Sequence, residues 1–130
     1  SPPSDSAMAS LASGVLLFGG RDSAGNTYLN DTWIWNGTSW VLQNPATKPP
    51  ARLGCTLVYD VARNRVVMFG GVLSGDVFAG DTWEWDGTNW TQVAASGPAA
   101  RFGHHMSYDA ERQRTVLFGG ALFFGTVFFD

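Results

Sequence analysis

Residues 31–40 read DTWIWNGTSW and residues 81–90 read DTWEWDGTNW, so two stretches of ten residues match at an offset of 50. A second motif, two apolar residues followed by two glycines, occurs three times, at 17–20, 68–71 and 117–120. Successive copies of this motif are offset by 51 and 49 residues. A period near 50 residues is typical of an array in which one supersecondary unit is repeated along the chain.

Each repeat has the pattern of four short strands. In the central copy, the apolar and β-branched runs and the alternating Trp segments predict strands at 54–60, 65–69, 81–85 and 89–93. The Asp86-Gly87 pair between the last two segments predicts a hairpin, because Gly accepts the positive φ that a tight turn needs. No segment shows sustained helical spacing, so the sequence predicts an all-β protein of antiparallel sheets.

These motifs resemble the kelch family. The marks that match are the Gly pairs after an apolar strand, the Tyr-Asp that ends the first strand, and Trp pairs seven residues apart at 33/40 and 83/90. The fuller pattern is similar to the kelch-type repeats of large bacterial proteins and to galactose-oxidase-like propellers. The resemblance covers residues 15–130 and implies a β-propeller whose blades are four-stranded antiparallel sheets.

The number of repeats falls short of a ring. The motifs predict a partial blade at 15–43, a full blade at 51–93 and a half blade at 100–130, after an irregular segment at 1–14. Propellers close with roughly four to eight blades. The tail from 121 to 129 adds four Phe to the apolar surface. Either the chain is part of a longer protein, or copies complete one another's ring. We expect a homo-oligomer, with the dimer and the trimer as leading candidates.

Composition excludes several classes of function. The net charge is −3 with a single Lys, so we expect no nucleic-acid partner. No run approaches the roughly 18 apolar residues of a membrane span, so no membrane partner is expected either. One Cys forms no internal disulfide. The first residues lack the pattern of a signal peptide, which leaves the location undetermined, with secretion and the periplasm open.

The two repeated arginines are the first candidates for ligand binding. In an antiparallel blade, the longer connections at 20–30, 43–51, 71–80, 94–100 and 121–129 emerge at one end, together with Arg52 and Arg101. As a ring of guanidinium groups, the two arginines would bind a carboxylate or a phosphate. The alternative is that each Arg braces its blade against the neighbouring loop, and the repetition of Arg in both copies favours this bracing role.

The only two histidines, His104 and His105, are candidate ligands of a divalent metal ion. His104 aligns with Cys55, which favours a structural role, whereas His105 breaks the repeat and is the candidate general base. Asp22 and Asp76 lie in the loops at the same end and are candidate ligand-binding carboxylates, or else ordinary solvated loop acids.

Two further hypotheses come from Cys55 and from the tryptophans. Galactose-oxidase-like enzymes use a Cys–Tyr crosslink beside copper, but Cys55 and Tyr59 lack identifiable further ligands, and we expect Cys55 to be a small buried side chain. The tryptophans could stack on sugars, although their repetition favours packing between blades.

The sequence therefore predicts a kelch-type propeller module that binds a small-molecule or protein ligand through its channel-side loops. One alternative is a metal-assisted hydrolase whose composite site lies on the oligomer axis. The other is a carbohydrate-binding propeller.

Overall fold

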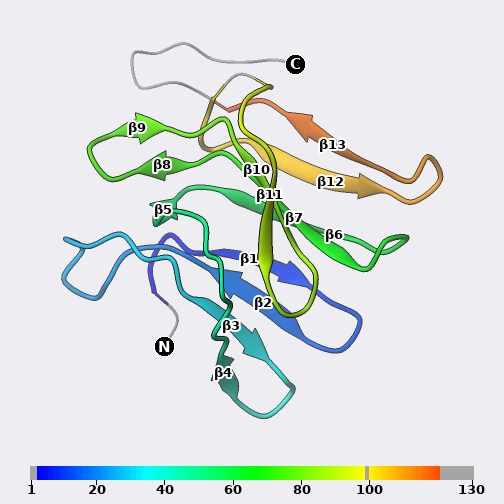
Figure 1. Cartoon of the computed structure of the whole chain (residues 1–130), viewed down its shortest axis with the longest axis horizontal. Coiled ribbons are helices and arrows are strands. Elements are labelled where there is room, and N and C mark those ends of the chain that lie inside the picture. Colours follow the sequence, from blue (N-terminus) through cyan, green and yellow to red (C-terminus); the bar gives the residue numbers. More distant parts are fainter. Residues whose placement is uncertain (1–2, 99, 121–130) are drawn as a thin grey trace.

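The protein is built from antiparallel sheets. The computed structural model describes residues 3–98 and 100–120, and within these ranges every strand pair is antiparallel and no helix occurs. The first sheet contains four strands in chain order (Figure 1): β1 (Ala7–Ser10), β2 (Val15–Phe18), β3 (Thr32–Trp35) and β4 (Trp40–Leu42).

The second and third copies of the repeat follow the same plan. The second sheet is formed by β6 (Thr56–Asp60), β7 (Arg65–Phe69), β10 (Thr82–Trp85) and β11 (Trp90–Ala94). Each of these strands lies within two residues of the bounds predicted for the central copy. The third copy supplies β12 (His105–Asp109) and β13 (Arg114–Phe118). The tail from 121 to 130, with its four Phe, lies outside the described residues.

Residues 1–14, expected to be irregular, instead contain β1. The AMAS sequence of β1 has no β-branched or aromatic residue and carries no strand signal of its own. It forms a strand because β2 would otherwise leave a row of backbone groups unpaired, and because Ala9 fits into the core with only 8% of its surface exposed. The first copy is thus a complete four-stranded sheet.

The predicted loop at 71–80 is also partly regular. It forms a hairpin of β8 (Val72–Leu73) and β9 (Val77–Phe78), and β8 pairs in turn with β5 (Arg52–Leu53). Single bridges in the first copy, Ser4 with Arg21 and Arg21 with Tyr28, occupy the matching positions. Such two-residue strands are too short to give a period in the sequence.

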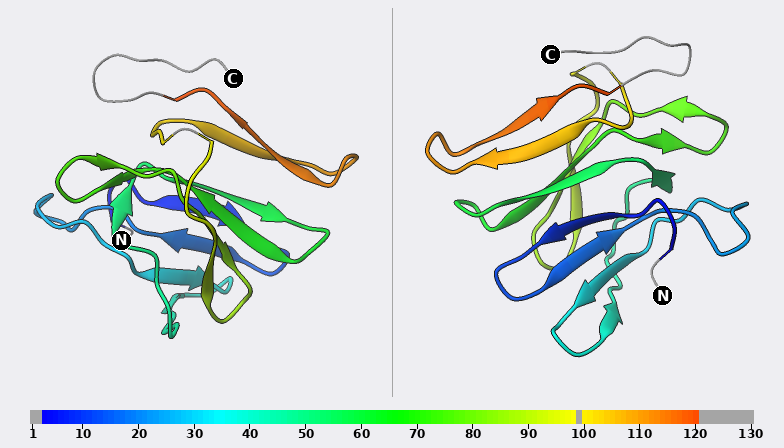
Figure 2. Two further views of the ribbon diagram at one scale, coloured as in Figure 1. Left: turned by 45° about the horizontal axis from the view of Figure 1, so that its top comes forward. Right: turned by 180° about the vertical axis from the view of Figure 1, so that it is seen from behind.

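The three copies lie side by side, with their first strands β1, β6 and β12 adjacent (Figure 2). Between the first two sheets, the Trp90 ring meets Phe18 edge-on at 5.3 Å. The Trp90 Nε1–H group donates a hydrogen bond of 2.9 Å to Thr32 Oγ1. Trp90 is only 1% exposed, so the prediction that the tryptophans pack between repeats holds for this residue.

A repeated set of backbone hydrogen bonds joins each copy to the next, and we call it the backbone junction. The N–H of Gly20 donates to the carbonyl of Arg52 over 3.0 Å, and the N–H of Gly71 donates to the carbonyl of Arg101 over 2.9 Å. Gly71 has a φ of +101°, and a Cβ there would lie 2.7 Å from the Leu53 carbonyl oxygen. The Gly-Gly motif is therefore required by the close approach of backbone at each junction.

No helix in the described ranges is long and apolar enough to span a bilayer.

Candidate functional site

The longer connections gather at one end of the molecule. Because neighbouring strands run antiparallel, the β8–β9 hairpin and the loop between β2 and β3 lie at one end (Figure 1). The turns that join β1 to β2, β6 to β7 and β12 to β13 lie at the other. We call the first of these the loop end. The sequence placed its candidate ligand-binding residues there.

Arg52 lies inside the protein and is fully buried. Its Nη1 and Nη2 groups donate to the two carboxylate oxygens of Asp81 over 2.6 and 2.9 Å. Nη1 also donates to the Gly70 carbonyl and Nε to the Pro50 carbonyl, both over 3.1 Å. The bidentate geometry that was proposed for an external anion is thus occupied by a carboxylate of the same chain.

Arg101 repeats this arrangement in the next copy. It is 2% exposed, and its Nη1 group donates to the Gly119 carbonyl over 2.9 Å. The hypothesis of a guanidinium ring open to carboxylates or phosphates is therefore wrong for Arg52 and gains no support from Arg101. Both arginines have the structural role that their repetition favoured, but these bonds hold groups of the same copy and not a loop of the neighbouring blade.

Asp81 is the acidic partner in this brace. Burial raises the pKa of its carboxyl, but hydrogen bonds from Arg52 and from Trp83 Nε1 outweigh this effect and hold the pKa below its ordinary value. The carboxylate is consequently ionised and paired near neutral pH.

His104 is buried between the second and third copies. Its Nε2 group lies 2.9 Å from the Phe69 carbonyl and 2.6 Å from Thr56 Oγ1. Since a carbonyl only accepts, Nε2 carries the proton, and the buried Nδ1 has no hydrogen-bond partner among the residues that the structure describes. Burial lowers the pKa of His104 to about 4. The ring is therefore neutral and structural, in agreement with its alignment to buried Cys55.

His105 is exposed on β12. Within residues 3–98 and 100–120, no three His, Cys, Asp or Glu side chains come close enough together to hold a metal ion. The described part of a single chain thus brings no third ligand of these types to His104 and His105. A metal site shared among several copies stays a prediction, as does the role of His105 as general base.

The two candidate loop acids have different surroundings. The Asp22 carboxylate accepts hydrogen bonds from the backbone N–H groups of Asn26 and Thr27, over 3.0 and 3.3 Å. These backbone hydrogen bonds lower the pKa of Asp22. Asp22 thus shapes its own loop. Asp76 is exposed at the turn of the β8–β9 hairpin, where its φ is +59°.

Cys55 is a buried free thiol whose pKa is raised to about 12 by burial. A nucleophilic Cys needs the opposite shift, because the thiolate is the reactive form. The Tyr59 hydroxyl donates to Asn64 Oδ1 over 2.6 Å and is engaged away from the thiol. Cys55 is therefore a core side chain, as expected.

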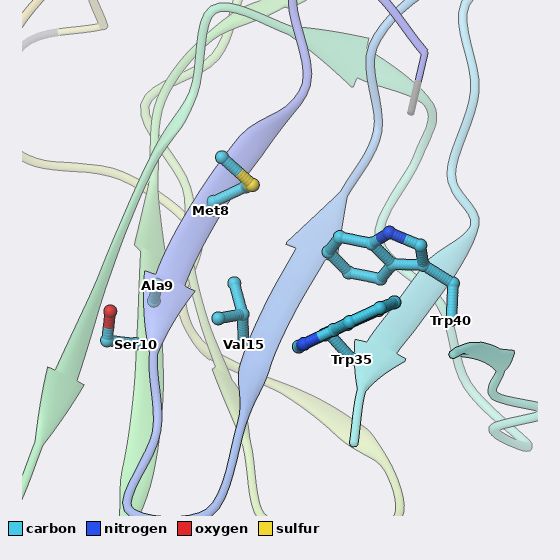
Figure 3. A pocket seen from close by; sticks show the side chains of 6 residues that line it. All are labelled: Met8, Ala9, Ser10, Val15, Trp35 and Trp40. Atoms are coloured by element: carbon cyan, nitrogen blue, oxygen red, sulfur yellow. The ribbon is translucent and has the colours of Figure 1, made fainter. Parts of the chain in front are cut away.

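Two of the repeated tryptophans, together with residues of β1 and β2 that the sequence did not single out, form an open depression of about 380 Å³ on the first sheet (Figure 3). Met8, Val15, Trp35 and Trp40 line it, and Met8 is 58% exposed. The two indole rings lie 5.6 Å apart at 54°. Both tryptophans belong to the repeat, but the repeat does not show that this face is exposed, and Met8 comes from the unrecognised strand β1.

These observations define an all-β protein in which antiparallel four-stranded sheets repeat along the chain. No family model and no curated protein matches the sequence. The fold is similar to that of a solved structure described as "Structure of YjhT", with a TM-score of 0.76 and 14% sequence identity. The match covers 97% of this chain and 41% of that one, so this chain spans less than half the length of its structural neighbour.

Proposed function

We propose that the chain is a kelch-type β-propeller module that binds a ligand at its loop end and assembles as a homo-oligomer. The observation that carries this proposal is the backbone junction, which repeats with equivalent partners between the first and second copies and between the second and third. A junction that repeats in this way adds copies along one direction, and propellers are built by such radial repetition.

Within residues 3–98 and 100–120, the two four-stranded sheets and the β12–β13 pair are fewer than the roughly four blades of the smallest rings. Additional copies of the chain would supply the missing sheets. The similarity to a longer chain, of which 41% is matched, supports an array that extends beyond the sheets described here.

The loop end is the best candidate for the binding surface. The backbone junctions hold the bases of the loops rigidly, whereas the tips around Asn26 and Asp76 are exposed. Variable loops on a rigid scaffold commonly bind ligands. Arg21 at this end is paired with Asp5, and Arg52 is buried. At the tip of the β8–β9 hairpin, the exposed carboxylate of Asp76 favours a neutral or cationic ligand over an anionic one, whereas the exposed Lys48 lies in the separate connection at 43–51.

Nuclear magnetic resonance of ¹⁵N-labelled protein tests the proposal. Neutral sugars, small ammonium compounds and small carboxylates would be titrated in turn. We expect binders among the first two classes, with amide shifts in residues 20–30 and 71–80. Asp76→Asn would weaken binding, whereas Glu111→Gln, which changes an exposed acid at the opposite end, would leave it unchanged. Shifts confined to the turns at 61–64 and 110–113 would contradict the proposal.

A further inference from the structure

We infer that two uncovered faces of the chain bind each other, so that copies associate head to tail through the contacts that already join the first two sheets. The inference rests on the proposed homo-oligomer and specifies its interface. The N-terminal end face consists of Met8, Ser10, Val15, Trp35 and Trp40. The C-terminal end face consists of His105, Ser107, Val116 and Phe118.

The N-terminal end face matches a face of the second sheet that is buried. The strand registers align Met8 with Leu57, and the repeat aligns Trp40 with Trp90. The Trp85–Trp90 pair has a ring distance of 5.5 Å and an angle of 53°, nearly the same as the Trp35–Trp40 pair. Leu57 and Trp90 are 8% and 1% exposed because the first sheet covers them, whereas Met8 is 58% exposed.

The C-terminal end face is equivalent to the face of the first sheet that packs against the second sheet. Phe18, Phe69 and Phe118 occupy one position in the three copies. Phe18 lies under Trp90 and is fully buried, Phe69 lies beside the His104 ring and is 2% exposed, and Phe118 is 54% exposed. Val116, equivalent to the buried Val67, is likewise 51% exposed.

The two end faces are therefore the separated halves of an interface that the chain forms internally. If a second chain follows the first by the step that relates the first two sheets, Trp40 of the second chain lies on Phe118 of the first chain. This contact is equivalent to that of Trp90 with Phe18 inside one chain. The same step places Ser6 of the second chain beside His105 of the first chain, equivalent to the position of His104 beside Thr56 inside one chain. A second copy is favoured as the occupant because it carries the matching residues in the matching arrangement. The interface is heterologous, since the two partners use different faces.

Mixing two variants tests this arrangement. Trp40→Asp disables the N-terminal end face and Phe118→Asp disables the C-terminal one. Each change should weaken self-association at least about 30-fold, as expected for a central aromatic contact. An equimolar mixture should form a dimer of twice the 14.0 kDa chain mass, because one intact junction remains. Val61→Asp, at an exposed position in the turn between β6 and β7, is the matched control and should associate like wild type.

Crosslinking tests the same contact without altering an aromatic residue. Ser6→Cys and His105→Cys chains would be mixed and treated with a short bismaleimide, and Cys55 is buried and stays unreactive. We expect a covalent dimer from this mixture and none from Ser6→Cys mixed with Glu111→Cys. Equal yields from the two mixtures, or none from the first, would overturn the inference.

The outcomes separate this inference from the function on which it rests. If wild type is oligomeric and both aspartate variants remain so, the head-to-tail interface is wrong while the homo-oligomer stands. If Phe118→Asp alone still dimerises, the contact joins two N-terminal end faces and the inference fails. If wild type is monomeric at high micromolar concentration, the homo-oligomer fails as well. Ligand binding at the loop end is measured independently by the amide shifts.

Discussion

Removing the buried brace at Arg52 should destabilise the protein strongly. In Arg52→Ala, the Asp81 carboxylate loses both of its bonds to guanidinium, and the Gly70 and Pro50 carbonyls each lose a donor. Breaking a buried ion pair by removing one partner typically costs about 3–5 kcal/mol, since the other charge is left without compensation. We expect the free energy of unfolding to fall by about this amount.

Arg63 provides a matched control. It forms the same bidentate pair with Glu84, over 3.1 and 2.8 Å, and it also bonds to Asp60. Its side chain is 52% exposed, however, whereas that of Arg52 is 0% exposed. Exposed pairs contribute about 1 kcal/mol or less. The buried Asp60 carboxylate still accepts a hydrogen bond of 3.2 Å from the backbone N–H of residue 63 when the side chain is removed. Arg63→Ala should therefore have a much smaller effect than Arg52→Ala, although both remove a bidentate bond to a carboxylate.

Urea unfolding monitored by tryptophan fluorescence measures both variants. With a slope of about 2 kcal/mol per molar urea, the midpoint of Arg52→Ala should fall by about 2 M. A double variant, Arg52→Met with Asp81→Leu, should be more stable than Arg52→Ala, because it leaves no unpaired charge. Equal effects of Arg52→Ala and Arg63→Ala would refute the view that burial makes the Asp81 pair a structural brace.

The sequence predicted most of the strands because they repeat. The second copy is the clearest case, since β7 was predicted at 65–69 and observed at Arg65–Phe69. The strand β1 could not be predicted, because its AMAS sequence becomes a strand only when β2 offers an edge. The short β8–β9 hairpin was missed for a similar reason, as two-residue strands carry no alternation.

The candidate site was predicted less well than the fold. The repetition of Arg52 favoured a brace, but its partner Asp81 lies 29 residues away in sequence, and only the pairing of the strands brings the two together. Alignment with Cys55 indicated that His104 is structural, which its burial supports. The end face around Trp40 escaped notice because exposure depends on which sheets are neighbours, and a repeat pattern shows only that the copies are alike.

Two further predictions concern single positions. In the folded protein the pKa of His104 is about 4, below its ordinary value of 6.5. Between pH 4 and pH 6.5, the unfolded chain therefore binds more protons at this residue than the folded chain does. The free energy of unfolding should therefore fall by up to about 3 kcal/mol as the pH drops from 6.5 to 4. Urea titrations at several pH values should show that His104→Leu loses this pH-dependent fall and that His105→Ala keeps it. Gly71→Ala should abolish or severely weaken folding, because its Cβ would lie 2.7 Å from a backbone oxygen. Gly87→Ala, with a similar φ of +106° and no atom within 4 Å, should lower the free energy of unfolding by about 1 kcal/mol in thermal or urea unfolding. Similar losses at both positions would contradict the close approach of backbone at the junction.

The mass of the protein in solution tests most directly whether sheets from other copies complete the array. Sedimentation equilibrium should give a mass above that of the 14.0 kDa chain, rising with concentration toward a fixed multiple. A mass of 14.0 kDa at every concentration up to the high micromolar range would show that the exposed Trp40 and Phe118 faces do not bind each other, and would contradict the proposed assembly.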